Sequence, residues 1–147
     1  MIARSDFLFG NEDEFAHLAR VMDIDHAVDT EDPQCYVKLC KQLHKRYHAK
    51  KVTPAVVVVT RGSKSVIVSD SLAKDPTEVK VPTVDPSLIK DTNGAGDSFV
   101  GGFLSQIVIG NAVERGVKAG MQCSRVVLQQ VGCSFPKNDP LPDPFNI

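Results

Sequence analysis

The chain of 147 residues is long enough to form one domain with a sizeable buried core. Its composition, 42% hydrophobic and 24% charged residues, is typical of a soluble globular protein and excludes an intrinsically disordered one. A net charge of −1 gives no overall attraction to nucleic acids or to anionic membranes. We therefore expect neither as a partner.

The start of the chain and its cysteines predict a cytosolic protein. No apolar run approaches the length of a membrane span, and residues 1–6 (MIARSD) lack the apolar core of a secretory signal. No CxxC pair is present, so we expect reduced thiols that mostly serve in packing. The four cysteines are Cys35, Cys40, Cys123 and Cys133.

The N-terminal third predicts one strand and two helices. Residues 6–10 (DFLFG) form the strand, and the acidic stretch 11–14 (NEDE) opens a helix that runs to Met22, because acidic side chains suit the positive end of the helix dipole. The second helix begins at Asp32-Pro33, an N-cap acceptor followed by proline. Its apolar face is formed by Tyr36, Leu39, Cys40, Leu43 and Tyr47.

The middle of the chain predicts paired strands. The unbroken apolar run at 54–60 (PAVVVVT) is typical of a strand buried on both faces, as in a parallel sheet covered by helices. Residues 61–64 form a turn, and residues 65–69 pair back as a strand. Residues 72–90 hold three prolines and predict a loop with one short strand around 79–81.

The C-terminal part predicts two helices and a coil. Apolar residues recur at helical spacing over 99–108, and the Gly-Asn pair at 110–111 ends that helix. The last helix runs over 113–128 and ends before Gly132 in the manner of a glycine C-cap. Residues 137–147 are proline-rich and predict a surface coil. Alternating strands and helices make the fold class α/β.

Residues 91–104 (DTNGAGDSFVGGFL) join a glycine-rich turn to a helix. The spacing excludes a Walker A loop, which needs a lysine, and the Rossmann fingerprint, whose third glycine is replaced by Phe99. Gly94, Ala95 and Gly96 can still present successive backbone N–H groups to an anion at the positive end of the helix. Such a nest would stabilise the charge on a phosphoryl group during transfer.

Asp97 follows this nest directly. A carboxylate repels a bound phosphate, but it is useful as a base that accepts a proton from an attacking hydroxyl. The alternative is that Asp97 only caps the helix, since aspartate is favoured in the first turn. Gly101 and Gly102 each cost the helix about 1 kcal/mol relative to alanine, and we attribute them to close packing of the helix on the sheet.

These motifs resemble those of the ribokinase-like (PfkB) carbohydrate and nucleoside kinases. The strings DTNGAGD at 91–97 and FVGGF at 99–103 look like the C-terminal signature of that family. FLFGNEDE at 7–14, FLSQI at 103–107 and GCSFP at 132–136 are most similar to its adenosine kinases. The resemblance covers essentially the whole chain and implies a ribokinase-like, Rossmann-like αβα sandwich.

The resemblance implies an activity and a set of partners. Such enzymes transfer the γ-phosphoryl of ATP, with Mg²⁺, to the 5′-hydroxyl of adenosine and give AMP for purine salvage. It implies adenosine and ATP as partners, no nucleic acid and no membrane, a monomeric full-length form, and a location in the cytoplasm and also the nucleus. Asp97 would be the catalytic base, Gly94, Ala95 and Gly96 the anion hole, and Asn93 would contact the nucleoside.

The same resemblance implies roles for two further pairs of residues. Asn11 and Glu14 match the family's Asn-x-x-Glu motif, which helps to organise Mg²⁺ and phosphate through water. Thr60 and Gly62 match the loop that lies along the ATP phosphates. Without the resemblance, the first pair would be explained by helix capping and the second by a plain turn between strands.

The chain departs from the family in length, because adenosine kinases are more than twice as long. Residues 1–147 therefore predict the C-terminal portion of the kinase domain, with the ATP-binding region and the base. The N-terminal part of the sheet, the sugar-recognising residues and the lid are expected to be missing. The alternative function is a non-catalytic kinase fragment that binds nucleotide, or a partner, through an exposed sheet edge.

The second helix suggests two further interpretations. Cys40, His44 and His48 recur every four residues, but one helix face spans too far for a compact zinc site. The same helix is rich in basic residues, which could bind nucleic acid but also suit the C-terminal end of a helix dipole. These residues are Lys41, Lys45, Arg46, Lys50 and Lys51.

Overall fold

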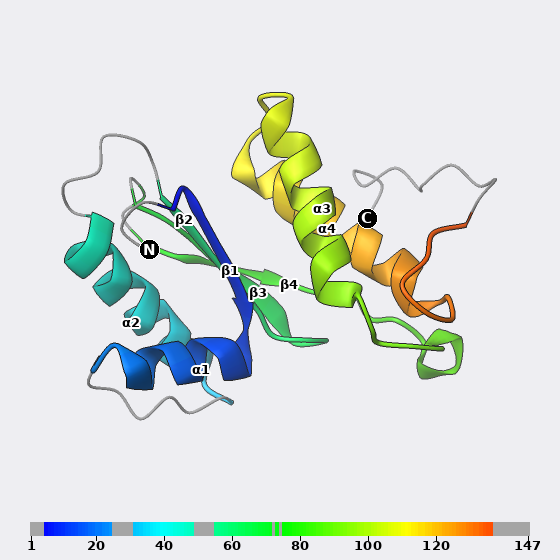
Figure 1. Cartoon of the computed structure of the whole chain (residues 1–147), viewed down its shortest axis with the longest axis horizontal. Coiled ribbons are helices and arrows are strands. Elements are labelled where there is room, and N and C mark those ends of the chain that lie inside the picture. The colour runs from blue at the N-terminus through cyan, green and yellow to red at the C-terminus, as the bar shows by residue number, and fades with distance from the viewer. Residues whose placement is uncertain (1–4, 25–30, 49–54, 72, 74, 137–147) are drawn as a thin grey trace. The chain divides into compact units, whose positions relative to one another are not determined.

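The computed structural model describes residues 5–24, 31–48, 55–71, 73 and 75–136. The chain forms two compact units, Met1–Val81 and Pro82–Ile147 (Figure 1). The first unit holds the sheet and two helices, and the second holds a pair of longer helices.

The first unit contains a four-stranded mixed sheet with the order β1-β2-β3-β4. Its strands are β1 (Phe7–Asn11), β2 (Val56–Thr60), β3 (Ser65–Asp70) and β4 (Thr77–Lys80). β1 and β2 are parallel, whereas β2 pairs with β3, and β3 with β4, in antiparallel fashion. The strand predicted around residues 79–81 is confirmed as β4. Because β1 and β2 run in the same direction, their carboxyl ends meet at one edge.

Two helices cover one face of this sheet. They are α1 (Glu12–Val21) and α2 (Pro33–Leu43), and α2 continues into the π-helical turn η2 (His44–His48). Both begin where predicted, and Asp32 is the N-cap of α2 as expected. Asn11 is the N-cap of α1, the explanation considered for it without the family resemblance. The shared core lies between these helices and the sheet and includes Phe15, Tyr36, Leu39, Leu43, Val57, Val59 and Ile67. All four valines of β2 are buried, which confirms the prediction from the unbroken apolar run.

The second unit is a helix pair, α3 (Ala95–Val108) and α4 (Val113–Leu128), preceded by the short 3₁₀ helix η3 (Pro86–Leu88). Glycines allow the two long helices to approach closely. A Cβ on Gly102 would lie 2.7 Å from the Ala119 carbonyl oxygen, and one on Gly120 would lie 2.8 Å from that of Phe99. The expected packing of Gly101 and Gly102 on the sheet is therefore wrong for Gly102, which contacts α4.

The predicted glycine C-cap of α4 is also wrong. The helix ends at Gln129, whose φ of −92° is not left-handed and whose N–H donates to the carbonyls of Val126 and Val127. Gly132 has a φ of +73°, but it lies beyond the helix, and its N–H donates to Asp91. The turn at Gly132 therefore serves a tertiary contact. The coil predicted for residues 137–147 and the side chain of Tyr47 lie outside the described residues.

The neighbouring glycines of α3 give a matched stability test. Gly101→Ala should raise the free energy of unfolding by about 0.5–1 kcal/mol, because alanine is the better helix former and a Cβ there meets no described atom within 4 Å. Gly102→Ala should instead lower it by about 1–2 kcal/mol, because the methyl group would overlap the backbone of α4. Urea unfolding followed by circular dichroism measures both; equal effects of the two substitutions would contradict the packing.

Candidate functional site

The predicted site residues lie in two groups, one in each unit. The first unit holds Asn11, Glu14, Thr60 and Gly62, and the second holds Asn93, Gly94, Ala95, Gly96 and Asp97. Each group lies where a helix begins or a strand ends.

Asn11 and Glu14 form a reciprocal capping box at the start of α1. The N–H of Glu14 donates to Asn11 Oδ1 at 2.9 Å, and the N–H of Asn11 donates to Glu14 Oε2 at 2.7 Å. Asn11 lies opposite Thr60 in the parallel register, and the Thr60 hydroxyl donates to the carbonyl of Gly10 at 3.4 Å. The parallel strands thus place Thr60 beside the capping box, at one edge of the sheet.

The turn that follows Thr60 closes tightly and places Gly62 at its tip. The N–H of Arg61 donates to the Ser65 carbonyl, and that of Lys64 donates to the Arg61 carbonyl, both at 2.9 Å. Gly62 has a φ of +55° and is exposed, and a Cβ there would meet no described atom within 4 Å. Its backbone is therefore accessible from solvent, as a loop that contacts a ligand through its main chain requires.

Arg61 is a residue of this site that sequence reasoning assigned only to a turn. Its side chain is 3% exposed, and its Nε donates to Glu12 Oε1 at 3.2 Å. The guanidinium also lies 5.5 Å from the centre of the Tyr36 ring. Burial, followed by the negative charge of Glu12, raises the pKa of Tyr36 to about 12. The available sequence signal was a charged residue directly after the valine-rich strand 56–60 (VVVVT).

The second group forms the start of α3. Gly94 is the N-cap residue, with a φ of +75°, and within the described part of the chain no side-chain hydrogen bond caps this helix end. Gly96 is exposed, and a Cβ there would meet no described atom within 4 Å. Asp97 lies in the first turn and is exposed, as is Asn93 in the preceding turn. An anion can therefore approach the backbone of this helix end at the exposed Gly96.

Asp91 fixes the turn that precedes α3. Its Oδ1 accepts the N–H of Asn93 at 2.9 Å, and its Oδ2 accepts the N–H of Gly132 at 3.0 Å. These hydrogen bonds, with that from Asn93 as the larger contribution, lower the pKa of the Asp91 carboxyl. Cys133 packs directly on Gly94, since a Cβ on Gly94 would lie 2.3 Å from its Sγ. The glycine turn is thus held between Asp91 and the segment that follows α4.

The buried environment of Cys40 argues against the zinc interpretation. Cys40 is fully buried, and burial raises the pKa of its thiol to about 12, whereas zinc binds the thiolate. His44 Nε2 is hydrogen-bonded to the hydroxyl and carbonyl oxygens of Ser69 instead. Within the described ranges, no three His, Cys, Asp or Glu side chains are grouped as metal ligands. The side chain of His48 lies outside the described residues.

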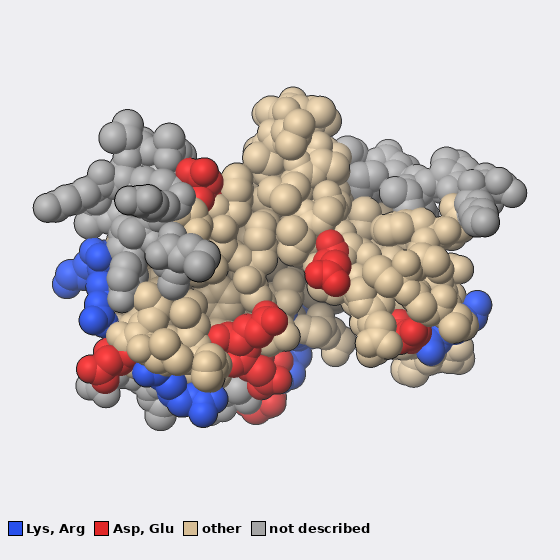
Figure 2. Space-filling model, viewed as in Figure 1, with Lys and Arg blue, Asp and Glu red and all other residues tan. Residues whose placement is uncertain are grey.

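Surface charge, the cysteines and helix hydropathy add three observations. Figure 2 shows basic and acidic side chains close together over the first unit, and Lys41 of α2 forms an ion pair with Asp75. All four cysteines carry free thiols, as expected. None of the helices in the described part of the chain is long and apolar enough to cross a membrane.

The Gly94 contact gives a test within the second unit. Gly94→Ala and Gly110→Ala both place a side chain at positive φ, which costs about 1–2 kcal/mol. Gly94→Ala should cost a further ~1–3 kcal/mol because its methyl group overlaps Cys133, whereas a Cβ at Gly110 would meet no described atom within 4 Å. Adding Cys133→Ala should recover part of the extra loss. Equal destabilisation by the two glycine substitutions, measured in urea, would rule out the Cys133 contact.

The lowered pKa of Asp91 predicts a pH dependence of stability. A carboxyl whose folded-state pKa is depressed stabilises the protein above its unfolded value of 3.8, and this contribution is lost as pH falls through the folded-state pKa. Asp91→Asn should therefore be less stable than the parent at pH 7, and the difference should shrink as the pH falls to about 2. Urea unfolding across this range measures it, and a difference that does not vary with pH would contradict the assignment.

Comparison with known proteins places the chain in a family. The family model described as pfkB family carbohydrate kinase matches residues 1–140. Adenosine kinase 1 of Arabidopsis thaliana is 40% identical over 134 residues, which cover 90% of this chain and 36% of that protein. Adenosine kinase of Schizosaccharomyces pombe is 31% identical, over 97% of this chain and 40% of its own length. The chain thus spans well under half the length of these relatives.

Solved structures agree with the fold. The structure of Anopheles gambiae adenosine kinase in complex with P1,P4-di(adenosine-5) tetraphosphate superposes with a TM-score of 0.78 at 30% identity, over 92% of this chain and 39% of that one. Ribokinase from Thermotoga maritima shares the fold at 20% identity, with a TM-score of 0.71 over 90% of this chain and 38% of its own. The predicted ribokinase-like α/β fold is confirmed, and the match over residues 1–140 shows that this chain belongs to the pfkB family of carbohydrate kinases.

Proposed function

We propose that the chain is the ATP-binding and catalytic-base portion of an adenosine kinase, which transfers the γ-phosphoryl of ATP to the 5′-hydroxyl of adenosine and gives AMP for purine salvage. The observation that carries the proposal is the start of α3, where an uncapped helix end, an open glycine backbone and an exposed Asp97 occur within one turn. The names of the Arabidopsis and Anopheles relatives support adenosine as the substrate.

The backbone of Gly94, Ala95 and Gly96 would form the anion hole. The first N–H groups of a helix have no intrahelical acceptor, and the helix dipole adds partial positive charge there. Negative charge spreads over the phosphoryl oxygens during transfer, so donors already fixed in place stabilise the transition state without reorganisation. The Asp91 hydrogen bonds and the Cys133 contact supply that rigidity.

Asp97 would accept the proton of the attacking 5′-hydroxyl. Its carboxylate lies in the first turn of the same helix, so the base and the anion hole move as one rigid element. Asn93, exposed in the preceding turn, would contact the nucleoside through its amide.

In the first unit, Thr60 and Gly62 would lie along the phosphates of ATP. Asn11 and Glu14 offer amide and carboxylate oxygens, which suit a hydrated Mg²⁺. Each of these oxygens accepts one capping hydrogen bond and has a further lone pair for a metal-bound water. When bound, Mg²⁺ would neutralise phosphate charge. Capping and metal organisation are thus compatible roles for the same pair.

In this proposal the partners are ATP and adenosine, without nucleic acid or membrane, for a cytoplasmic and also nuclear enzyme whose full-length form is monomeric. Residues 1–147 correspond to the C-terminal portion of its kinase domain. A second candidate is a non-catalytic fragment that binds nucleotide or a partner through the sheet edge. That candidate is favoured by β1, which among the described strands pairs with β2 alone.

One assay separates the two candidates. The chain should transfer labelled phosphate from ATP·Mg²⁺ to adenosine, and Asp97→Asn should lower kcat by about 10²–10⁴-fold while ATP binding is retained, because only the proton acceptor is lost. Glu114→Gln is the matched control, since it removes a carboxylate from the first turn of α4 in the same unit and should leave kcat unchanged.

Each other outcome has a defined meaning. ATP binding without phosphate transfer would favour the non-catalytic candidate. Transfer that survives Asp97→Asn would exclude Asp97 as the base, and transfer to another sugar or nucleoside instead of adenosine would remove adenosine as the substrate.

A further inference from the structure

Arg61 lies between the two residues proposed to contact the ATP phosphates, Thr60 and Gly62, yet its side chain is buried. A buried guanidinium is costly unless its donors are satisfied. Here Nε donates to Glu12 Oε1 at 3.2 Å, Nη1 to Ser65 Oγ at 3.1 Å, and Nη2 to the carbonyl oxygen of Glu31 at 3.0 Å.

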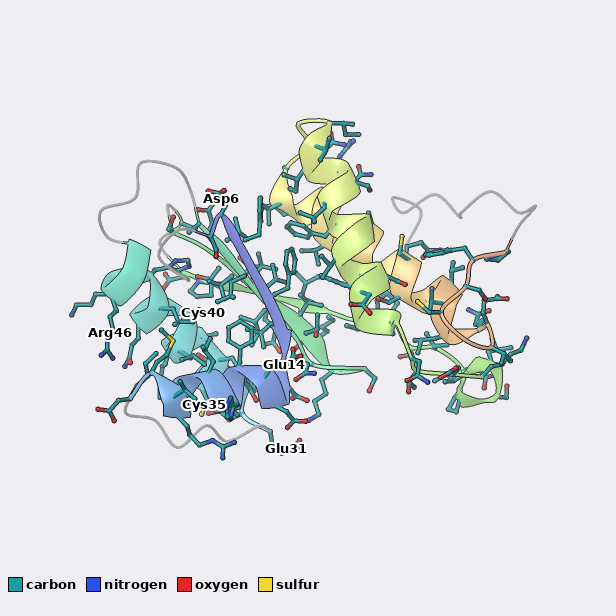
Figure 3. The ribbon with its side chains drawn as sticks, viewed as in Figure 1. Asp6, Glu14, Glu31, Cys35, Cys40 and Arg46 are labelled. Carbon is teal, nitrogen blue, oxygen red and sulfur yellow. The ribbon has the colours of Figure 1, made fainter. Side chains whose placement is uncertain are left out.

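These acceptors come from separate segments of the first unit. Glu12 is the first residue of α1 and follows Asn11 directly, Glu31 precedes the N-cap of α2, and Ser65 begins β3. Figure 3 shows Glu14, in the first turn of α1, and Glu31 at the same end of this unit. Lys64 is hydrogen-bonded to both Glu12 and Glu31, so the starts of the two helices lie close to the 61–64 turn. Arg61 therefore ties its own turn to the beginnings of both helices.

The planar guanidinium suits this task better than an ammonium. It presents donors in several fixed directions, so one side chain can hold three acceptors that lie apart. Tyr36 packs beside it and limits its movement. Lys64 forms ion pairs with Glu12 at 3.4 Å and with Glu31 at 2.9 Å. Its side chain is 41% exposed, so solvent screens these ion pairs and they contribute less than the buried contacts of Arg61.

We infer that Arg61 is a positioning residue that holds the 61–64 turn against the start of α1, and thereby keeps Thr60 and Gly62 in place for the phosphates of a nucleoside triphosphate. The nucleotide part of this inference rests on the proposed function. The positioning part rests only on contacts within the first unit, so the two can be tested separately.

The test compares Arg61→Met, Arg61→Lys and Glu12→Gln with the parent chain, and uses Lys41→Met as the control. Lys41→Met also removes a cation from the first unit. The ion pair it breaks joins α2 to Asp75 and does not involve the 61–64 turn. Glu12→Gln leaves Arg61 in place, and covers the case in which Arg61→Met fails to fold. The first readout is hydrogen exchange at the amides of Asn11 and Lys64, with Val58 of β2 as an internal reference.

Arg61→Met should speed exchange at Asn11 and Lys64 by about tenfold or more, the equivalent of one lost charge-assisted hydrogen bond. Exchange at Val58 should change much less, because the effect is local. Glu12→Gln should act in the same direction but less strongly, Arg61→Lys should lie between Arg61→Met and the parent, and Lys41→Met should match the parent. Unchanged exchange at the turn, or an equal increase at Val58, would overturn the positioning role.

The second readout is the Kd for ATP, measured by calorimetry. It should rise by about tenfold in Arg61→Met, with partial rescue by Arg61→Lys, while Lys41→Met leaves it unchanged. Faster exchange at the turn with an unchanged Kd would overturn the nucleotide part of the inference. A parent chain that binds no ATP would instead overturn the proposed function together with that part, and the exchange data would still decide whether Arg61 positions the turn.

Discussion

The parallel pairing of β1 with β2 is the constraint on which the first unit depends. Two parallel strands end at the same edge, so Asn11 and Thr60 become neighbours although 49 positions separate them. α1 begins where β1 ends, and the 61–64 turn begins where β2 ends. A capping box and a glycine turn are ordinary local structures. The sheet turns them into one polar edge, and the buried guanidinium of Arg61 holds the two together.

In the second unit, the main feature is the N-terminus of α3, whose backbone N–H groups are left without a side-chain cap among the described residues. An uncapped helix N-terminus leaves backbone donors without intrahelical acceptors, an arrangement that most helices avoid with a polar side chain. Here Gly94 is the N-cap residue, and Asp91 fixes the preceding turn by accepting the N–H groups of Asn93 and Gly132. Cys133 leaves no space for a larger residue at position 94. The tight glycine contacts between α3 and α4 give this turn a rigid support. A phosphoryl group would supply the missing acceptor in the proposed function.

Much of the fold could be predicted because its signals are local. The helix start at residues 11–14, the Asp32 cap, the valine run of β2 and the break at Gly110 each depend on a few adjacent residues, and each was confirmed. The errors concern contacts between distant segments. Gly132 looked like a helix cap but serves Asp91, and Gly102 contacts α4. Residue type shows that a glycine is needed, but it does not show which neighbour requires it.

The same division holds for the candidate site. The sequence by itself determined which residues to propose for the chemistry, because residue type and spacing single out the glycine turn and the aspartate after it, and the resemblance to the family singles out the Asn-x-x-Glu pair. Only the tertiary structure decided how the residues of each group are held. It placed Thr60 beside Asn11, it packed Cys133 on Gly94, and it buried Arg61 among acceptors from three segments. The physical reason is that burial and hydrogen bonding of a side chain depend on partners far away in the chain, which no local pattern encodes.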